Sequence, residues 1–268
     1  MNQTFDYKTT GLISGLMLGS HKSRQRGTGS DFYKKSLFLD EPDTSRLDLN
    51  ASLTDPFESL HVKSYRQRSK IDVILLIDGS SSMLYGEKAT LMHHVYESTK
   101  ASVEAANDRF SCYLLKEKLI KLGDADALTT ELTNLQPESN QAEATQQVFP
   151  ILPGKPALVF LVSDFHRPET QLQSLLTVLS AHLVVPMVLW QSKEFLDFPL
   201  WRFVVLTDLE TGASSLVFIT RDQKQKIQQQ YDDRKTYLTQ QFRRFNQHPF
   251  WLIDHYDARQ MSRYFSMQ

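Results

Sequence analysis

One stretch of the chain reads Ile71-Asp72-Val73-Ile74-Leu75-Leu76-Ile77-Asp78-Gly79-Ser80-Ser81-Ser82-Met83, a nearly unbroken apolar run that ends in a polar loop. Such a run of strand-forming residues predicts a central parallel strand that is buried on both faces of a sheet. The loop would then follow the carboxyl end of the strand, where open α/β sheets place their ligand sites. We therefore expect a functional site directly after the strand.

Strand and helix patterns alternate beyond this loop. Further strands are expected at 110–115, 118–122, 157–163, 182–190, 202–207 and 250–253, and helices at 86–107, 125–135, 141–149, 168–180, 222–246 and 258–265. The alternation predicts an α/β fold with a doubly wound, mostly parallel sheet. The apolar runs at 71–77, 110–115, 157–163 and 182–190 should be neighbouring parallel strands. A very short turn before 118–122 makes that strand antiparallel, at an edge.

The composition is that of a folded globular protein. The chain has 268 residues, 41% of them hydrophobic, and a net charge of −1, which argues against binding to nucleic acid. Residues 1–66 are polar and irregular, and we expect an N-terminal extension there, followed by one domain over 67–268. Within the extension, the segment 21–30 carries four possible cations and is either a solvated loop or a basic patch that contacts an acidic partner. Nucleic-acid binding through His21–Arg26 is a further reading, against which the near-neutral net charge argues.

Cys112 is the only cysteine, so an intramolecular disulfide and a cysteine-based zinc cluster are excluded. A single cysteine agrees with a reducing compartment. The longest apolar stretches are far shorter than the roughly 18–20 residues that a spanning helix requires. We therefore expect a cytoplasmic protein without stable membrane insertion, whose oligomeric state the sequence leaves open.

Asp78, Ser80 and Ser82 form a D-x-S-x-S pattern that supplies one carboxylate and two hydroxyls within a tight turn. All three are hard oxygen donors of the kind that Mg²⁺ takes, usually with several waters retained. Asp164 also follows an apolar strand and would lie at the same edge of the sheet. It is a further candidate ligand, although aspartate at such a position often caps the next helix.

Enzyme motifs with related spacing do not match this loop. A nucleophile elbow needs G-x-S-x-G, and Met83 stands where the second glycine belongs. The chain has no G-x-x-x-x-G-K-[ST] for nucleotide phosphates. We predict no catalytic residues and no organic cofactor, and we retain as the alternative a hydrolase that uses the same Asp78/Asp164 cleft.

The metal loop resembles the metal-ion-dependent adhesion site of von Willebrand factor A domains. Over most of its length the chain also resembles a bacterial von Willebrand factor A-like family labelled domain of unknown function fifty-eight, whose members are often encoded beside MoxR-type AAA+ ATPases. The matching positions are Gly19, His21, Ser23, Gly27, Gly29, Phe32, Asp43, Arg46, Asp48, Val62-Lys63, Val162-Ser163-Asp164-Phe165 and Leu206–Gly212.

The resemblance implies a non-enzymatic, Mg²⁺-dependent adaptor that binds a MoxR-like AAA+ ATPase or that ATPase's client. Asp78, Ser80, Ser82 and Asp164 would hold the ion, and an Asp or Glu of the partner would fill its open position. The adhesion-site pattern also takes a threonine from a middle loop. Counting back from Asp164 leads instead to Ser139 and Asn140. Either of them would complete the shell, and the absence of the threonine would weaken metal binding.

Overall fold

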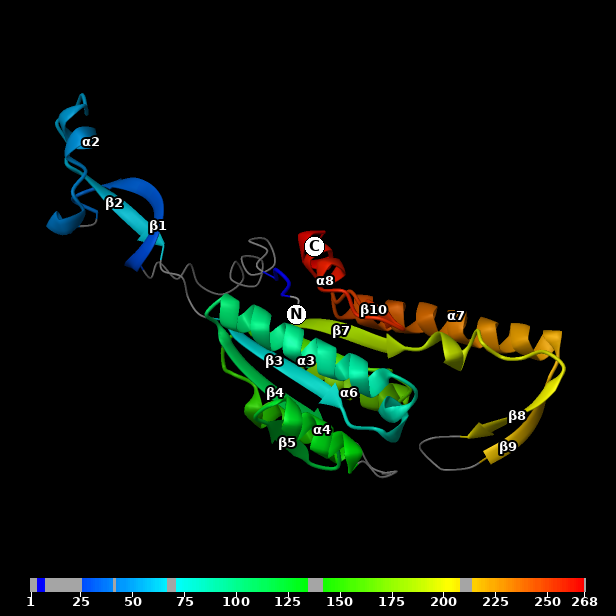
Figure 1. Ribbon diagram of the computed structural model, residues 1–268. Coiled ribbons are helices and arrows are strands. Elements are labelled where there is room, and N and C mark those ends of the chain that lie inside the picture. The colour runs from blue at the N-terminus through cyan, green and yellow to red at the C-terminus, as the bar shows by residue number, and fades with distance from the viewer. Residues whose placement is uncertain are drawn as a thin grey trace. The chain divides into compact units, whose positions relative to one another are not determined.

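The computed structural model describes residues 4–7, 26–40, 42–66, 71–134, 142–207 and 214–267. By its internal contacts the chain divides into two units, a smaller one over 17–70 and a main one made of the rest (Figure 1). The boundary expected between residues 66 and 67 stays a prediction.

A six-stranded sheet forms the centre of the main unit, in the order β10-β7-β6-β3-β4-β5. Its strands are β3 (Asp72–Asp78), β4 (Arg109–Leu115), β5 (Leu119–Leu122), β6 (Leu158–Ser163), β7 (Leu183–Trp190) and β10 (Phe250–Ile253). β3 pairs in parallel with β4 and β6, and only β5 is antiparallel, at one edge. The predicted fold class and the predicted neighbours are therefore confirmed.

The strand order creates a switch point beside β3. Numbered along the chain within this sheet, the strands lie in the order 3-2-1-4-5-6, and the direction of winding reverses between β3 and β6. Open α/β sheets bind ligands outside the carboxyl ends of the strands at such a point. The ends of β3 and β6, and hence Asp78 and Asp164, flank it.

Helices cover both faces of the sheet, as the doubly wound prediction requires. They are α3 (Lys88–Ala105), α4 (Ala125–Thr133), α5 (Ala142–Val148), α6 (Glu169–Val178), α7 (Arg221–Arg244) and α8 (Ala258–Ser266). Each overlaps a helix expected from the sequence. Short 3₁₀ turns occupy η2 (Ser81–Leu84), η3 (Phe149–Ile151) and η4 (Ser192–Glu194).

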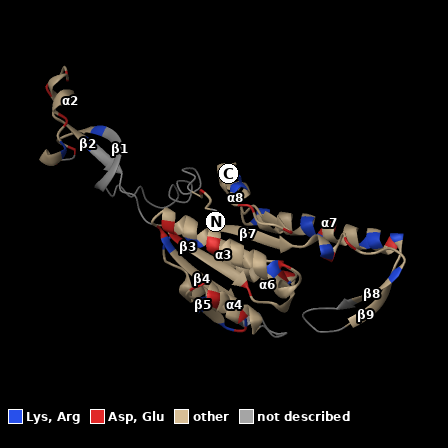
Figure 2. Ribbon diagram, viewed as in Figure 1, with Lys and Arg blue, Asp and Glu red and all other residues tan. Residues whose placement is uncertain are grey.

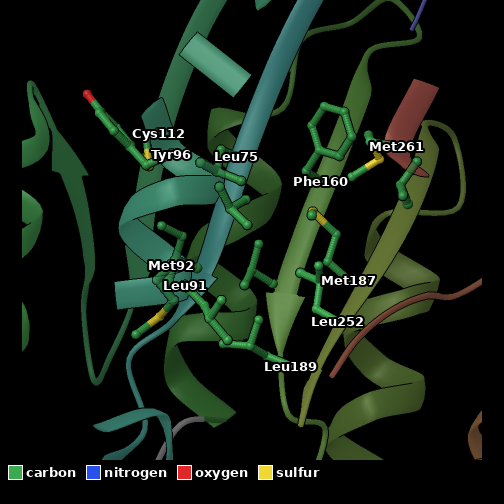
Figure 3. Packing of buried hydrophobic residues seen from close by; sticks show 14 of the residues in the cluster. Leu75, Leu91, Met92, Tyr96, Cys112, Phe160, Met187, Leu189, Leu252 and Met261 are labelled. Carbon is green, nitrogen blue, oxygen red and sulfur yellow. The ribbon is translucent and has the colours of Figure 1, made fainter. Parts of the chain in front are cut away.

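Alternate residues of β3 enter two different cores. Val73, Leu75 and Ile77 pack with residues of α3, α4 and α8, a cluster partly drawn in Figure 3. Ile74 and Leu76 pack on the opposite face, with residues of α6 and α7. Because successive side chains of a strand point to opposite faces, a strand covered on both sides must be apolar throughout. This explains the unbroken apolar run from Val73 to Ile77.

Residues 4–7 belong to the main unit although they lie far from it in sequence. Phe5 and Tyr7 are buried in the same cluster as α8. The ring of Phe5 stacks on Phe265 at 6.3 Å and meets Phe160 edge-on at 5.8 Å.

A separate antiparallel ribbon joins β8 (Arg202–Thr207) to β9 (Ser214–Ile219). The sequence correctly predicted a strand at 202–207, but placed it in the strand–helix alternation of the main sheet. It pairs instead with β9, which the sequence pattern did not identify. The ribbon is a sheet of its own.

The smaller unit contains β1 (Arg26–Leu37) and β2 (His61–Arg66), paired antiparallel, with η1 (Thr44–Arg46) and α2 (Leu49–Leu53) between them. Asp48 caps α2 by accepting the backbone N–H of Ala51 at 3.2 Å. The sequence predicted an irregular extension with a loop over 21–30. Residues 21–25 lie outside the described residues, but residues 26–30 begin β1, so the irregular extension is wrong where the structure describes it: strand pairing orders β1 and β2. Within the described chain, no helix combines the length and the apolar character needed to cross a membrane.

Candidate functional site

The D-x-S-x-S loop lies where the sequence placed it, directly after β3. The strand ends at Asp78, and the backbone N–H of Gly79 donates to the carbonyl of Leu115 at 2.8 Å. A Cβ at position 79 would lie 2.9 Å from that same carbonyl oxygen, so only glycine allows so close an approach. The chain then turns into η2.

The structure brings the four principal predicted residues together. Asp78 Oδ1 accepts the backbone N–H of Ser80 at 3.1 Å, and the hydroxyls of Ser80 and Ser82 lie 3.1 Å apart. The Ser82 hydroxyl in turn hydrogen-bonds the Asp164 carboxylate. Ser139 and Asn140 lie outside the described residues, so their predicted role stays a prediction.

A lysine occupies the space between these groups. Lys88, the first residue of α3, is 1% exposed, and its Nζ lies 3.1 Å from Asp164 Oδ2 and 2.5 Å from Glu194 Oε1. The same ammonium donates to the backbone carbonyl of Ser82 at 3.3 Å. It therefore connects the D-x-S-x-S loop with the loops that follow β6 and β7.

The other carboxylate has a cation of its own. Arg167 lies 2.5 Å from Asp78 Oδ2, and the Ser163 hydroxyl donates to that same oxygen at 2.5 Å. The carboxylate and the guanidinium are both buried. Ser163 also accepts the backbone N–H of Phe165 at 2.9 Å, which holds the loop after β6 in a tight turn.

Burial and charge act in opposite directions on Asp164. Burial alone raises the pKa of its carboxyl, whereas the Lys88 ammonium, then His166 and the Ser82 hydroxyl, lower it. The net shift of the pKa is downward. The carboxylate is therefore held in its ionised form by its neighbours.

Sequence reasoning missed the three charged residues Lys88, Arg167 and Glu194. Their spacing matches no motif, and each comes from a different element. One local signal was available at Lys88, because a cation at the first position of a helix opposes the helix dipole and needs compensation. The partners that compensate it are visible only in three dimensions.

As arranged here, these residues do not fit a directly bound Mg²⁺. Both oxygens of Asp78 accept protein donors, and so do both oxygens of Asp164, from the His166 N–H at 3.2 Å and from Lys88. Each of these two residues is 2% exposed, which leaves no open side for a partner's carboxylate. Among the residues that the structure describes, no cluster of three or more His, Cys, Asp or Glu side chains is placed to hold a metal ion. The Mg²⁺ site stays a prediction.

A family model described as "Protein of unknown function DUF58" matches residues 43–238. The chain belongs to the DUF58 family. The matched region includes the D-x-S-x-S loop, Lys88, Asp164, Arg167 and Glu194. It also includes the β8–β9 ribbon. The family identified from partial motifs in the sequence is thereby confirmed.

Two solved structures are similar to this DUF58 chain at low identity. The conserved hypothetical protein BatB from Bacteroides thetaiotaomicron has 12% identity and a TM-score of 0.41, over 74% of this chain and 98% of its own. An aerotolerance-related membrane protein from Bacteroides fragilis has 11% identity and a TM-score of 0.39, over 74% and 97%. No curated protein matches the chain significantly. These scores are too low to bear on function, and the fold rests on the strand order described above.

Proposed function

We propose that this DUF58 chain is a non-enzymatic protein-interaction adaptor whose partner is a MoxR-like AAA+ ATPase or that ATPase's client. The partner class comes from the family resemblance. One observation carries the adaptor role, an exposed apolar face on the β8–β9 ribbon. The residues of this ribbon face, with their exposed fractions, are Trp201 (60%), Phe203 (68%), Val205 (62%), Leu216 (65%) and Phe218 (37%).

The strand register gathers these side chains on one side of the ribbon. Phe203 pairs with Phe218, and Val205 pairs with Leu216. The rings of Phe203 and Phe218 lie 4.9 Å apart, and Trp201 lies 6.4 Å from Phe218. Contiguous exposed apolar patches on a soluble protein mark interaction sites, and aromatic residues dominate the energies of such interfaces.

Ribbon stability supports the same conclusion. A two-stranded hairpin is at best marginally stable in water and normally needs a further strand or a helix against its apolar face. A partner that covers the ribbon face would supply that packing. The hydrophobic gain is about 25 cal/mol per Å² of apolar surface removed from water.

A charge substitution on the ribbon face tests the proposal. Phe203→Asp should weaken binding to the purified MoxR-like ATPase of the same host by about 30-fold or more, since a buried aromatic anchor at an interface is worth at least about 2 kcal/mol. The matched control is Phe149→Asp, because Phe149 is an aromatic residue of the main unit with a similar exposure of 70%. Binding is measured by titration calorimetry. Equal affinity of the two variants and the wild type would show that the ribbon face is not the contact.

The same titration, repeated with a chelator, distinguishes metal-dependent binding from binding through the ribbon face. Metal-dependent bridging through Asp78 and Asp164 requires that a chelator abolish binding, whereas contact through the ribbon face survives it. The hydrolase alternative requires a turnover that Asp78→Asn removes. Neither outcome is needed for an adaptor that binds through apolar contact.

A further inference from the structure

We propose that Lys88 is a built-in cation that organises the D-x-S-x-S loop in place of a divalent metal ion. Three oxygens surround its Nζ: Asp164 Oδ2 at 3.1 Å, Glu194 Oε1 at 2.5 Å and the Ser82 carbonyl at 3.3 Å. Two carboxylates and a carbonyl are the donors that a hard cation takes from a protein. This cage is filled by the side chain of the protein itself.

Charge balance at the switch point supports this assignment. Asp78, Asp164 and Glu194 contribute three carboxylates, and Lys88 and Arg167 contribute two cations that contact them. Buried charges persist only when they are paired and hydrogen-bonded. With Lys88 in place, an added divalent ion would lie beside an ammonium and would turn a net charge of −1 into +1. Removal of Lys88 would instead leave Asp164 and Glu194 without the cation that they share.

The position of Lys88 in its helix shows that the acids hold it there. Residue 88 begins α3, where the helix dipole presents partial positive charge and disfavours a cation. The side chain is nevertheless 1% exposed. Glu194 is itself fixed, because its second oxygen accepts the Gln191 N–H at 3.2 Å. The Glu194 carboxylate is therefore positioned for the ammonium by its own loop.

Ion-dependent thermal unfolding tests the inference without reference to a partner. The wild type should melt at the same temperature in millimolar Mg²⁺, in millimolar Ca²⁺ and in chelator. Lys88→Met should melt about 10 °C lower in chelator, since loss of one member of a buried ion pair is strongly destabilising. Mg²⁺ or Ca²⁺ should restore part of that loss, because either ion can then occupy the oxygen cage.

Lys116→Met is the matched control. Lys116 pairs with Glu131 at 2.9 Å, and its side chain is more accessible than that of Lys88. This variant should lose little stability and gain no response to either ion. The inference would be overturned if Lys88→Met also lost little stability and showed no response to either ion, because the three oxygens would then need no cation.

A comparison of the wild type with Asp78→Asn tests the inference by a second route, should Lys88→Met fail to fold. In titration calorimetry with Mg²⁺, the wild type should show no more binding than Asp78→Asn does. Mg²⁺ binding that is present in the wild type and lost in Asp78→Asn would overturn the inference and establish the metal site in its place. The adaptor role is tested separately, by the partner binding of Phe203→Asp. Failure of the Lys88 proposal can therefore be distinguished from failure of the adaptor proposal.

Discussion

Two buried acids, the Asp164 carboxyl and the Cys112 thiol, show how neighbours determine the charge of single residues. Asp164 is buried, but Lys88 and its hydrogen bonds hold its pKa below the usual range. Cys112 lies in the apolar cluster of the sheet, and burial raises the pKa of its thiol. The first residue is therefore kept ionised and the second neutral.

Cys112 gives a pH dependence that can be measured. An unfolded thiol ionises near pH 8.5, whereas the folded one retains its proton well above that. Its contribution to stability is fully present below about pH 8.5 and is lost as the pH rises toward the folded pKa. The free energy of unfolding of the wild type should therefore approach that of Cys112→Ala by about 2 kcal/mol between pH 7 and pH 10, in urea titrations. A constant difference between the two proteins would contradict the assignment.

Residue-level prediction from the sequence succeeded where spacing within one loop carried the signal. Asp78, Ser80 and Ser82 were identified because a strand end and a tight turn place them together. Lys88 was not, because its partners come from two other loops. A sequence pattern indicates which side chains are close in sequence. Burial of an ion pair depends on tertiary contacts across the sheet, which the pattern does not contain.

At the scale of elements, α7 is tied to the loop that carries the site. Arg234 of α7 donates to the backbone carbonyls of Phe165, at 2.5 Å, and Arg167, at 3.1 Å. Phe165 has a φ of 56°, in the left-handed region that bulky residues seldom adopt. The helix therefore stabilises a strained turn between Asp164 and Arg167. Acidic and basic side chains are otherwise interspersed along α7 (Figure 2).

Arg234→Met should destabilise the main unit by about 1–3 kcal/mol, because two partly buried carbonyls lose their charged donor. The control is Arg243→Met, on the same helix but exposed, which should change stability by about 0.5 kcal/mol or less. Urea unfolding followed by circular dichroism measures both variants. Equal stability of the two would show that α7 does not restrain the turn.

The elements themselves were largely predictable. β3, β6 and β7 are covered on both faces, so each reads as an apolar run. β8 gave a similar run, although it lies in a ribbon with one exposed face. An apolar pattern reports that a strand forms and not which strand it pairs with, and β9 begins with exposed serines. Pairing between β8 and β9 was therefore beyond the reach of the sequence pattern.

At the scale of the whole molecule, residues from opposite ends of the chain close one core. Phe5 donates its backbone N–H to the Ser102 hydroxyl at 2.9 Å, and its ring packs against Phe160 and Phe265. Tyr7 donates its hydroxyl to Asp108 at 2.6 Å. The first described segment thus connects α3, β6 and α8, although the residues of the smaller unit separate it from them in sequence.

Phe5→Ala should therefore destabilise the main unit by about 3–5 kcal/mol, the usual cost of removing a buried aromatic ring, and lower its melting temperature by about 10 °C. Phe57→Ala is the control, since Phe57 belongs to the smaller unit and is 86% exposed. Removal of the Phe57 ring should leave the unfolding transition of the main unit unchanged. Calorimetry of both variants separates the two cases. A main transition that is insensitive to Phe5→Ala would mean that the six-stranded sheet and its helices are complete without the N-terminal segment.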